Sequence, residues 1–170
     1  MQDQASMPRP ILCDFDRDAM DCIWSKVKAD TWSHNGGFTD GWWLDPSTMY
    51  HGKGMLSMSS GLYSQIVEHN TAVDELVEDI QNGIRREAER MDRHDGFVQL
   101  HSVSGGAGSG LSKLISQHLA DEYKKAQNIS YALFPSESHK SRSMVVEPYN
   151  FTLCYNSLVR SSSMIAAFSN

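Results

Sequence analysis

A glycine-rich segment offers the clearest chemistry in this sequence. Ser104-Gly105-Gly106-Ala107-Gly108-Ser109-Gly110 lies between a predicted strand and a predicted amphipathic helix. Backbone N–H groups of such a loop can approach a phosphate closely because few side chains shield them. The helix that follows adds unpaired N–H groups and the positive end of its dipole. Ser102 and Ser109 can add hydroxyl donors, so the segment predicts an anion site, most naturally for the phosphates of a nucleotide.

The common phosphate-loop and nucleophile motifs do not fit this segment. A Walker loop requires Gly-Lys followed by Ser or Thr, which is absent. In a dinucleotide pattern Gly106 and Gly108 fit, but Leu111 stands at the third glycine. The hydrolase elbow fails because Ala107 and Leu111 flank Ser109 at the required distance. An alternative that stays open is a glycine-rich turn that serves only close packing of a helix on a strand.

Acidic residues follow two other predicted elements. Glu147 precedes Pro148 at the start of a helix, where a carboxylate can bond a ribose or the free N–H groups of the helix itself. Asp14 and Asp16 follow the first predicted strand, where they can hold Mg²⁺ through water or simply solvate a loop. The three cysteines form no CxxC pair, and the histidines form no HExxH motif. We therefore expect no zinc site, no disulfide framework and a reducing compartment.

The elements that must position these residues alternate along the chain. Apolar runs predict strands at 11–13, 97–103, 129–134 and 164–168. Helical spacing predicts helices over about 20–27, 71–88, 111–123 and 149–161, with Thr71 as an N-cap and Gly83 permitting close packing. Residues 30–65 show no period and predict a long irregular loop. The alternation predicts an α/β fold, a mostly parallel sheet with helices on both faces.

Composition excludes several classes of protein. The chain has 170 residues and a net charge of −6, which suits one globular domain or a large piece of one. An acidic chain, with a pI near 5.6, argues against a nucleic-acid binder and against a protein that sits on anionic membranes. No apolar run approaches the roughly 20 residues that span a bilayer, and the N-terminal residues are not those of a signal peptide.

Four separated segments, in order, resemble the tubulin family. His101 to Gly110, HSVSGGAGSG, resembles the tubulin phosphate-loop signature, and Val145 to Asn150, VVEPYN, is identical to a segment of many tubulins. Pro8 to Asp16 resembles the family's Pro-Arg-Ala-Ile-Leu-Val-Asp-Leu-Glu, and Arg85 to Ala88 its Arg-Lys-Glu-Ala. The resemblance covers residues 7–29 and 70–170 well and residues 30–65 poorly.

The resemblance implies a Rossmann-like, tubulin-type domain that binds GTP or GDP with Mg²⁺. Asp16 falls where the family has an acid near Mg²⁺, Glu147 where it contacts ribose, and Asn170 where an asparagine contacts guanine. The residues that would cradle the phosphates are Ser102, Gly105, Gly106, Ala107 and Gly108. The chain departs from the family at Ser104, which replaces a glycine, and at Ala107, which replaces a threonine.

The resemblance also sets expectations for the whole molecule. Residues 1–170 would be a partial tubulin-like domain with a divergent insertion at about 30–65, exposing sheet edge and apolar surface that a full tubulin covers. The expected partners are other tubulin subunits in a head-to-tail polymer, with a cytoplasmic, microtubule-associated location. GTPase activity would be weak and assembly-dependent, because the family's catalytic acid would lie beyond this chain. The alternatives are a degenerate fragment without nucleotide and an NAD-type Rossmann oxidoreductase.

Overall fold

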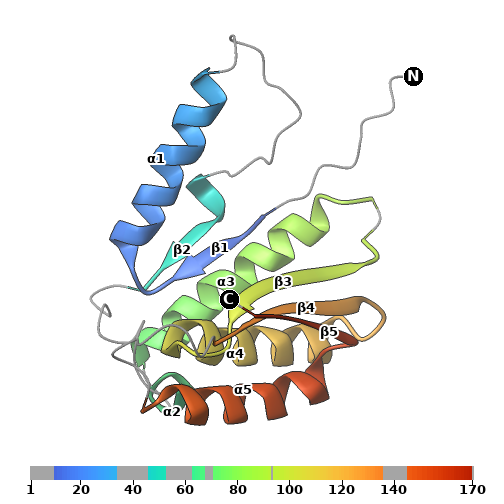
Figure 1. Cartoon of the computed structure of the whole chain (residues 1–170). Helices are drawn as coiled ribbons and strands as arrows, with labels where there is room; N and C mark the ends of the chain where they lie inside the picture. Colours follow the sequence, from blue (N-terminus) through green and yellow to red (C-terminus); the bar gives the residue numbers. More distant parts are fainter. Residues whose placement is uncertain are drawn as a thin grey trace.

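The strands of the chain form two parallel sheets. The computed structural model describes residues 10–33, 46–52, 63–67, 71–92, 94–135 and 145–169. Strand β1 (Leu12–Asp14) pairs with β2 (Met49–His51), and β3 (Gly96–Ser102), β4 (Gln127–Phe134) and β5 (Met164–Ser169) form a sheet in that order. Every pairing is parallel, and the strands run toward the same side of the molecule (Figure 1). The predicted α/β class with a parallel sheet is confirmed.

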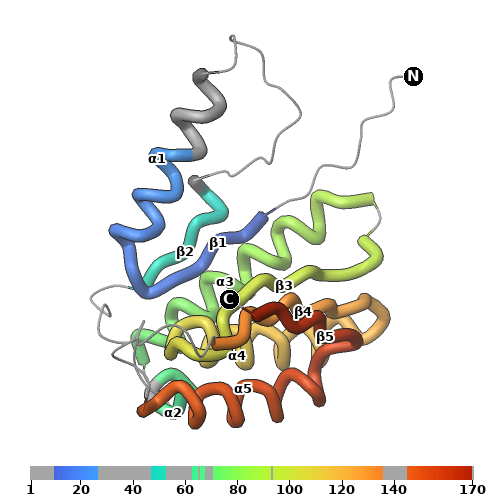
Figure 2. The backbone as a smooth tube through the Cα atoms, in the orientation of Figure 1, coloured from blue at the N-terminus to red at the C-terminus, as the bar shows by residue number. Residues whose placement is uncertain are grey.

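Helices connect and cover these strands. They are α1 (Arg17–Ser33), the 3₁₀ turn η1 (Pro46–Thr48), α2 (Tyr63–Val67), α3 (Thr71–Glu89), α4 (Gly106–Glu122) and α5 (Glu147–Ser161). Two consecutive crossovers, β3–α4–β4 and β4–α5–β5, build the three-stranded sheet and set α4 and α5 side by side (Figure 2). The short helix α2 packs against both α4 and α5. Among the described residues no helix is long and apolar enough to cross a bilayer.

The helix α3 joins the two sheets through the larger core. Its buried apolar side chains recur at helical spacing, as predicted, and include Val73, Leu76, Ile80 and Ile84. They pack with Phe15 beside β1 and with apolar residues of α4. Charged residues line the opposite, exposed face of the helix. The apolar period of α3 therefore specifies both the helix and the face that it buries.

The segment predicted to be irregular holds regular structure in the parts that the structure describes. Residues 30–65 include the end of α1, the turn η1, the strand β2 and the start of α2. β2 is positioned by Tyr50, whose ring packs against Gly83 of α3, and Arg86 Nη2 donates to Tyr50 Oη at 2.9 Å. A side chain at position 83 would overlap that ring, which confirms that Gly83 permits close packing. Tertiary contact, not local pattern, creates this strand.

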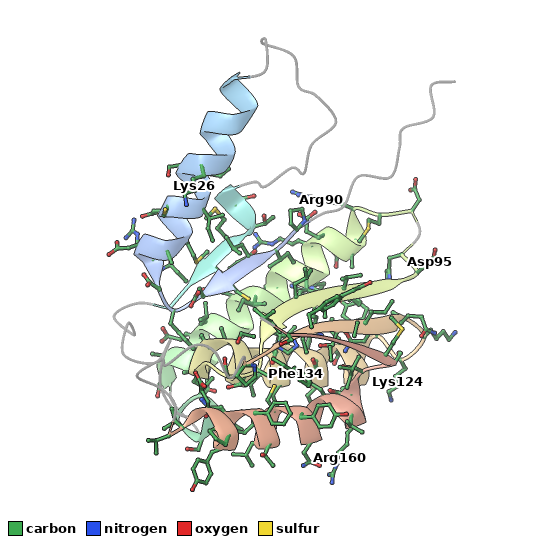
Figure 3. All side chains as sticks on the ribbon, in the orientation of Figure 1. Lys26, Arg90, Asp95, Lys124, Phe134 and Arg160 are labelled. Carbon is green, nitrogen blue, oxygen red and sulfur yellow. The ribbon has the colours of Figure 1, made fainter. Side chains whose placement is uncertain are left out.

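The two faces of β3–β5 differ in polarity. The face that meets α4 and α5 carries Gln99, His101, Asn128 and Ser130, which bond one another and α4. Phe134 of β4 lies between the sheet and α5 (Figure 3), edge-on to Phe151 at 5.0 Å between ring centroids. The other face is apolar, and its Leu100 is 72 % exposed. Within the described residues, α4 and α5 therefore cover one face of this sheet, and the apolar face stays exposed.

Candidate nucleotide site

The predicted site residues gather at one edge of the fold. β3 ends at Ser102, and α4 begins four residues later at Gly106. The carboxyl ends of β1 and β3–β5 and the N-terminal ends of α4 and α5 lie on the same side, at the left in Figure 1. Open parallel sheets bind ligands at this edge, because the strand ends and helix N-termini converge there. The fold thus brings the glycine-rich segment, the first acidic segment and Glu147 to a common edge.

The link between β3 and α4 is shorter than predicted. Only Val103, Ser104 and Gly105 lie between the two elements, and Gly106 to Gly110 already belong to the helix. Gly105 is the N-cap residue, with no side chain capping the helix, and its carbonyl accepts from Ser109 N at 3.0 Å. The first-turn N–H groups of α4 therefore have no side-chain acceptor from the N-cap. A helix N-terminus of this kind suits a phosphate.

Two of the glycines in this helix serve packing. A Cβ on Gly108 would meet the Ser102 carbonyl oxygen, and a Cβ on Gly110 would lie 2.6 Å from the Cβ of Ile66 in α2. Gly108 lets α4 approach the end of β3, and Gly110 lets α2 approach α4. The packing explanation of the glycine-rich segment therefore accounts for Gly108 and Gly110. It coexists with the phosphate explanation, which rests on the amides at the start of the helix.

The two candidate hydroxyls behave differently. Ser109 is fully buried, and its Oγ donates to the Gly105 carbonyl at 2.6 Å, so its predicted role as a phosphate donor is wrong. Ser102 lies at the strand end, where its Oγ is 2.9 Å from the Oγ of Ser104 and accepts from Ser104 N at 3.3 Å. These bonds fix Ser102 and Ser104 against each other at the start of the loop.

The first acidic segment has a structural role of its own. Asp16 Oδ1 accepts from Ala19 N at 3.1 Å, which makes Asp16 an N-cap of α1, and Asp14 Oδ1 accepts from Phe15 N at 2.6 Å. No group of three or more His, Cys, Asp or Glu gathers as a cation site among the described residues. Mg²⁺ often takes only one or two carboxylates, with water and phosphate oxygens completing its shell. The carboxylate oxygens of Asp14 and Asp16 therefore fit a Mg²⁺ ion that is held mainly by water and phosphate, and they do not fit a site built from protein ligands alone.

Glu147 and Asn170 complete the predicted set. Glu147 is the first residue of α5, half-buried and followed by Pro148, so its carboxylate stabilises the helix N-terminus. That position faces the same edge as the glycine-rich segment. Asn170, the predicted guanine contact, lies outside the described residues.

A buried asparagine, Asn150, was not singled out from the sequence. It ends the VVEPYN segment, and its side chain is completely buried. Its Nδ2 donates to the Ser104 carbonyl at 3.0 Å, and its Oδ1 accepts from Tyr63 N at 2.8 Å. The sequence offered one signal for this residue, its place at the end of the VVEPYN segment.

Two of the three free cysteines, Cys13 and Cys154, are poor nucleophiles. Burial and, to a smaller extent, the nearby Asp14 carboxylate raise the pKa of Cys13 to about 12. Burial likewise raises the pKa of Cys154 to about 11, although a hydrogen bond with Ser112 acts against this. Cys22 is exposed, and none of the three is in a disulfide. With raised pKa values, the thiols of Cys13 and Cys154 are not suited to thiolate chemistry.

A cavity of about 210 Å³ lies at the opposite end of the sheet. Its lining includes Phe97, Tyr123, Lys124 and Arg160, and the last two are labelled in Figure 3. The cavity opens beside the C-terminal ends of α4 and α5, at the far end of these helices from the glycine-rich segment.

His101 predicts a pH dependence of stability. Its Nε2 is 2.7 Å from Ser130 Oγ, and burial lowers its pKa below the usual 6.5, with backbone hydrogen bonds acting against this. Just below pH 6.5 this histidine is protonated in the unfolded chain but stays neutral in the folded chain. Stability is therefore complete above that pH and falls as the pH drops toward the folded-state pKa. In urea unfolding between pH 7.5 and 5, His101→Gln should reduce the dependence of the unfolding free energy on pH. The same pH dependence as in wild type would contradict the role assigned to His101.

Comparison with known proteins gives a consistent match. The Tubulin/FtsZ family, GTPase domain, matches residues 1–170. Over 160 residues the chain is 32 % identical to the tubulin beta-1 chain of Colletotrichum graminicola, covering 94 % of this chain and 32 % of that protein. Over 157 residues it is 31 % identical to the tubulin beta chain of Bombyx mori, covering 92 % and 30 %. The chain thus spans about a third of the length of these relatives.

Proposed function

Because the chain belongs to the Tubulin/FtsZ family, we propose that it binds GTP and GDP and acts as a tubulin-like cytoskeletal subunit. The observation that carries the proposal is the start of α4, which directly follows β3 with a glycine N-cap and no capping side chain. That arrangement presents backbone donors where an open parallel sheet binds its ligand. The family match favours a guanine nucleotide over NAD, which was the alternative for the same geometry.

Each predicted site residue has a role in this proposal. Glu147 would bond the ribose, and Asp16 would hold Mg²⁺ through the carboxylate oxygen that does not cap α1. Asn170 would contact the guanine. The phosphates would be held at the end of β3 and in the first turn of α4, by Ser102, Gly105, Gly106, Ala107 and Gly108. When bound, Mg²⁺ would neutralise charge on the phosphates.

The assembly partners in this proposal are other tubulin subunits. The chain would join a head-to-tail polymer in the cytoplasm, as part of the microtubule cytoskeleton or a related filament. Its acidic charge supports neither nucleic acid nor an anionic membrane as a partner. Any GTP hydrolysis would be weak in the isolated chain and would depend on assembly.

Nucleotide-dependent melting tests the proposed binding. The purified chain is melted with Mg²⁺ alone and with excess GTP, GDP, ATP or NAD. A ligand that binds only the folded state at 100 times its Kd adds about 2.7 kcal/mol, so GTP and GDP should each raise the melting temperature by several degrees. ATP and NAD serve as controls and should not.

The outcomes separate the remaining alternatives. A shift with NAD alone would restore the oxidoreductase alternative. A cooperative transition that no nucleotide moves would support a degenerate fragment and contradict the proposal.

A further inference from the structure

The side chain of Asn150 connects three separate elements at the proposed site. It comes from the first turn of α5, it reaches the loop after β3, and it reaches the first residue of α2. Both polar ends of the amide are used, Nδ2 as a donor to the Ser104 carbonyl and Oδ1 as an acceptor from Tyr63 N. The Asn150 side chain is 0 % exposed, and its bond to Tyr63 N is buried.

The loop carbonyl that Asn150 holds lies directly before the proposed phosphate donors. Ser104 is followed by Gly105, the N-cap of α4, and then by the first turn of that helix. The side chain of Ser104 is also held by β3, because its hydroxyl bonds the hydroxyl of Ser102. Because a peptide unit is planar, holding the Ser104 carbonyl also orients the N–H of Gly105. Asn150 and Ser102 together therefore set the path of the chain into α4.

The second bond ties α2 to the same loop. Tyr63 is the first residue of α2, and its N–H is one of the groups that a helix start leaves without an internal partner. Its side chain packs with Val103, Cys154 and Leu158. Farther along α2, Ile66 packs against Gly110 of α4. Asn150 thus caps a helix that itself packs against the glycine-rich start of α4.

We propose that Asn150 is a positioning residue that aligns the loop at Ser104–Gly106 for the phosphates of a nucleotide. The inference rests on the proposed GTP binding. It adds that affinity for the phosphates depends on a side chain of α5 that the phosphates need not touch. Without the amide, the Ser104 carbonyl and the Tyr63 N–H would both lose this partner, and the loop would lose its fixed orientation.

The experiment compares three nucleotides on the full chain. GMP, GDP and GTP affinities are measured by calorimetry for wild type, for Asn150→Ala and for Asn156→Ala, an exposed asparagine on the same helix. We expect Asn150→Ala to weaken the affinity for GTP at least tenfold and the affinity for GMP less than threefold. Asn156→Ala should match wild type. General loss of structure would weaken all three nucleotides by the same factor, so the GTP-to-GMP ratio separates positioning from stability.

A second variant covers the case in which Asn150→Ala does not fold. Asn150→Asp keeps the size and the acceptor, and its protonated form regains a donor toward Ser104. Relative to wild type at the same pH, its GTP affinity should recover between pH 7.5 and 5. An unchanged GTP-to-GMP ratio in Asn150→Ala, or no recovery in Asn150→Asp, would overturn the positioning role alone. Failure of wild type to bind any of the three would overturn the proposed function and this role with it.

Discussion

Gly108→Ala is expected to destabilise the chain by about 1–3 kcal/mol, the usual cost of overpacking, and to abolish GTP binding. The new Cβ would meet the Ser102 carbonyl oxygen and lie 3.2 Å from both the carbonyl carbon and the amide nitrogen of Ser102. These are backbone atoms of a strand paired with β4 at Leu133, so they cannot rotate aside. Alanine favours a helix over glycine by only about 1 kcal/mol, which does not offset the overlap.

Urea unfolding and GTP titration of the same samples measure this effect. Gln117→Ala, an exposed position on the same helix, is the matched control and should stay within about 0.5 kcal/mol of wild type. Wild-type stability in Gly108→Ala would show that α4 does not approach β3 as closely as the geometry requires. Lost stability with retained GTP affinity would separate the packing role of Gly108 from its proposed place in the phosphate cradle.

The strongest predictions from the sequence came from patterns that repeat over many residues. The helix α3 shows five turns of apolar spacing, and both its ends and its buried face follow from Val73, Leu76, Ile80 and Ile84. The strands β3 and β4 lie within one or two residues of their predicted bounds. Local period and core burial agree in these elements, so the pattern alone is sufficient to identify them.

Elements that depend on distant contacts could not be predicted. β2 has three residues, too few to show an alternating pattern, and it exists because β1 offers a free edge and α3 offers a glycine to Tyr50. The early start of α4 has the same origin. A run of glycine and serine disfavours a helix locally, but Gly108 and Gly110 fit closely against β3 and α2, and that fit favours helix over loop.

The site was predictable in composition but not in detail. The glycine-rich segment, Asp16 and Glu147 do lie at one edge, as an open parallel sheet requires. The structure adds that the Ser109 hydroxyl bonds a carbonyl at the start of its own helix and that Asp16 is the N-cap of α1. Asn150 shows the converse, because only the fold reveals that its amide joins residues 46 and 87 positions away in the chain.

The stability of the β3–β5 half is expected to depend on a small cluster. The apolar face of this sheet contributes little burial, since Val98 is 58 % exposed and Leu100 is 72 % exposed. The face toward the helices carries polar side chains that bond one another. Apolar burial between α5 and the sheet therefore concentrates in the cluster of Tyr63, Val103, Ala132, Cys154 and Leu158, separate from the larger core around α3 and α4.

Leu158→Ala should consequently lower the free energy of unfolding by about 2–5 kcal/mol, enough to unfold a marginally stable chain. Leu158 is 0 % exposed, whereas its neighbour Val159 is 56 % exposed on the same helix. Val159→Ala is thus the control, expected to change the free energy by less than about 0.5 kcal/mol. Circular dichroism during urea unfolding measures both. Because Val103 of this cluster directly precedes Ser104, loss of the cluster should also release the loop, so GTP should no longer raise the melting temperature of Leu158→Ala. Equal stability of the two variants would mean that α5 is not held to the sheet by this cluster.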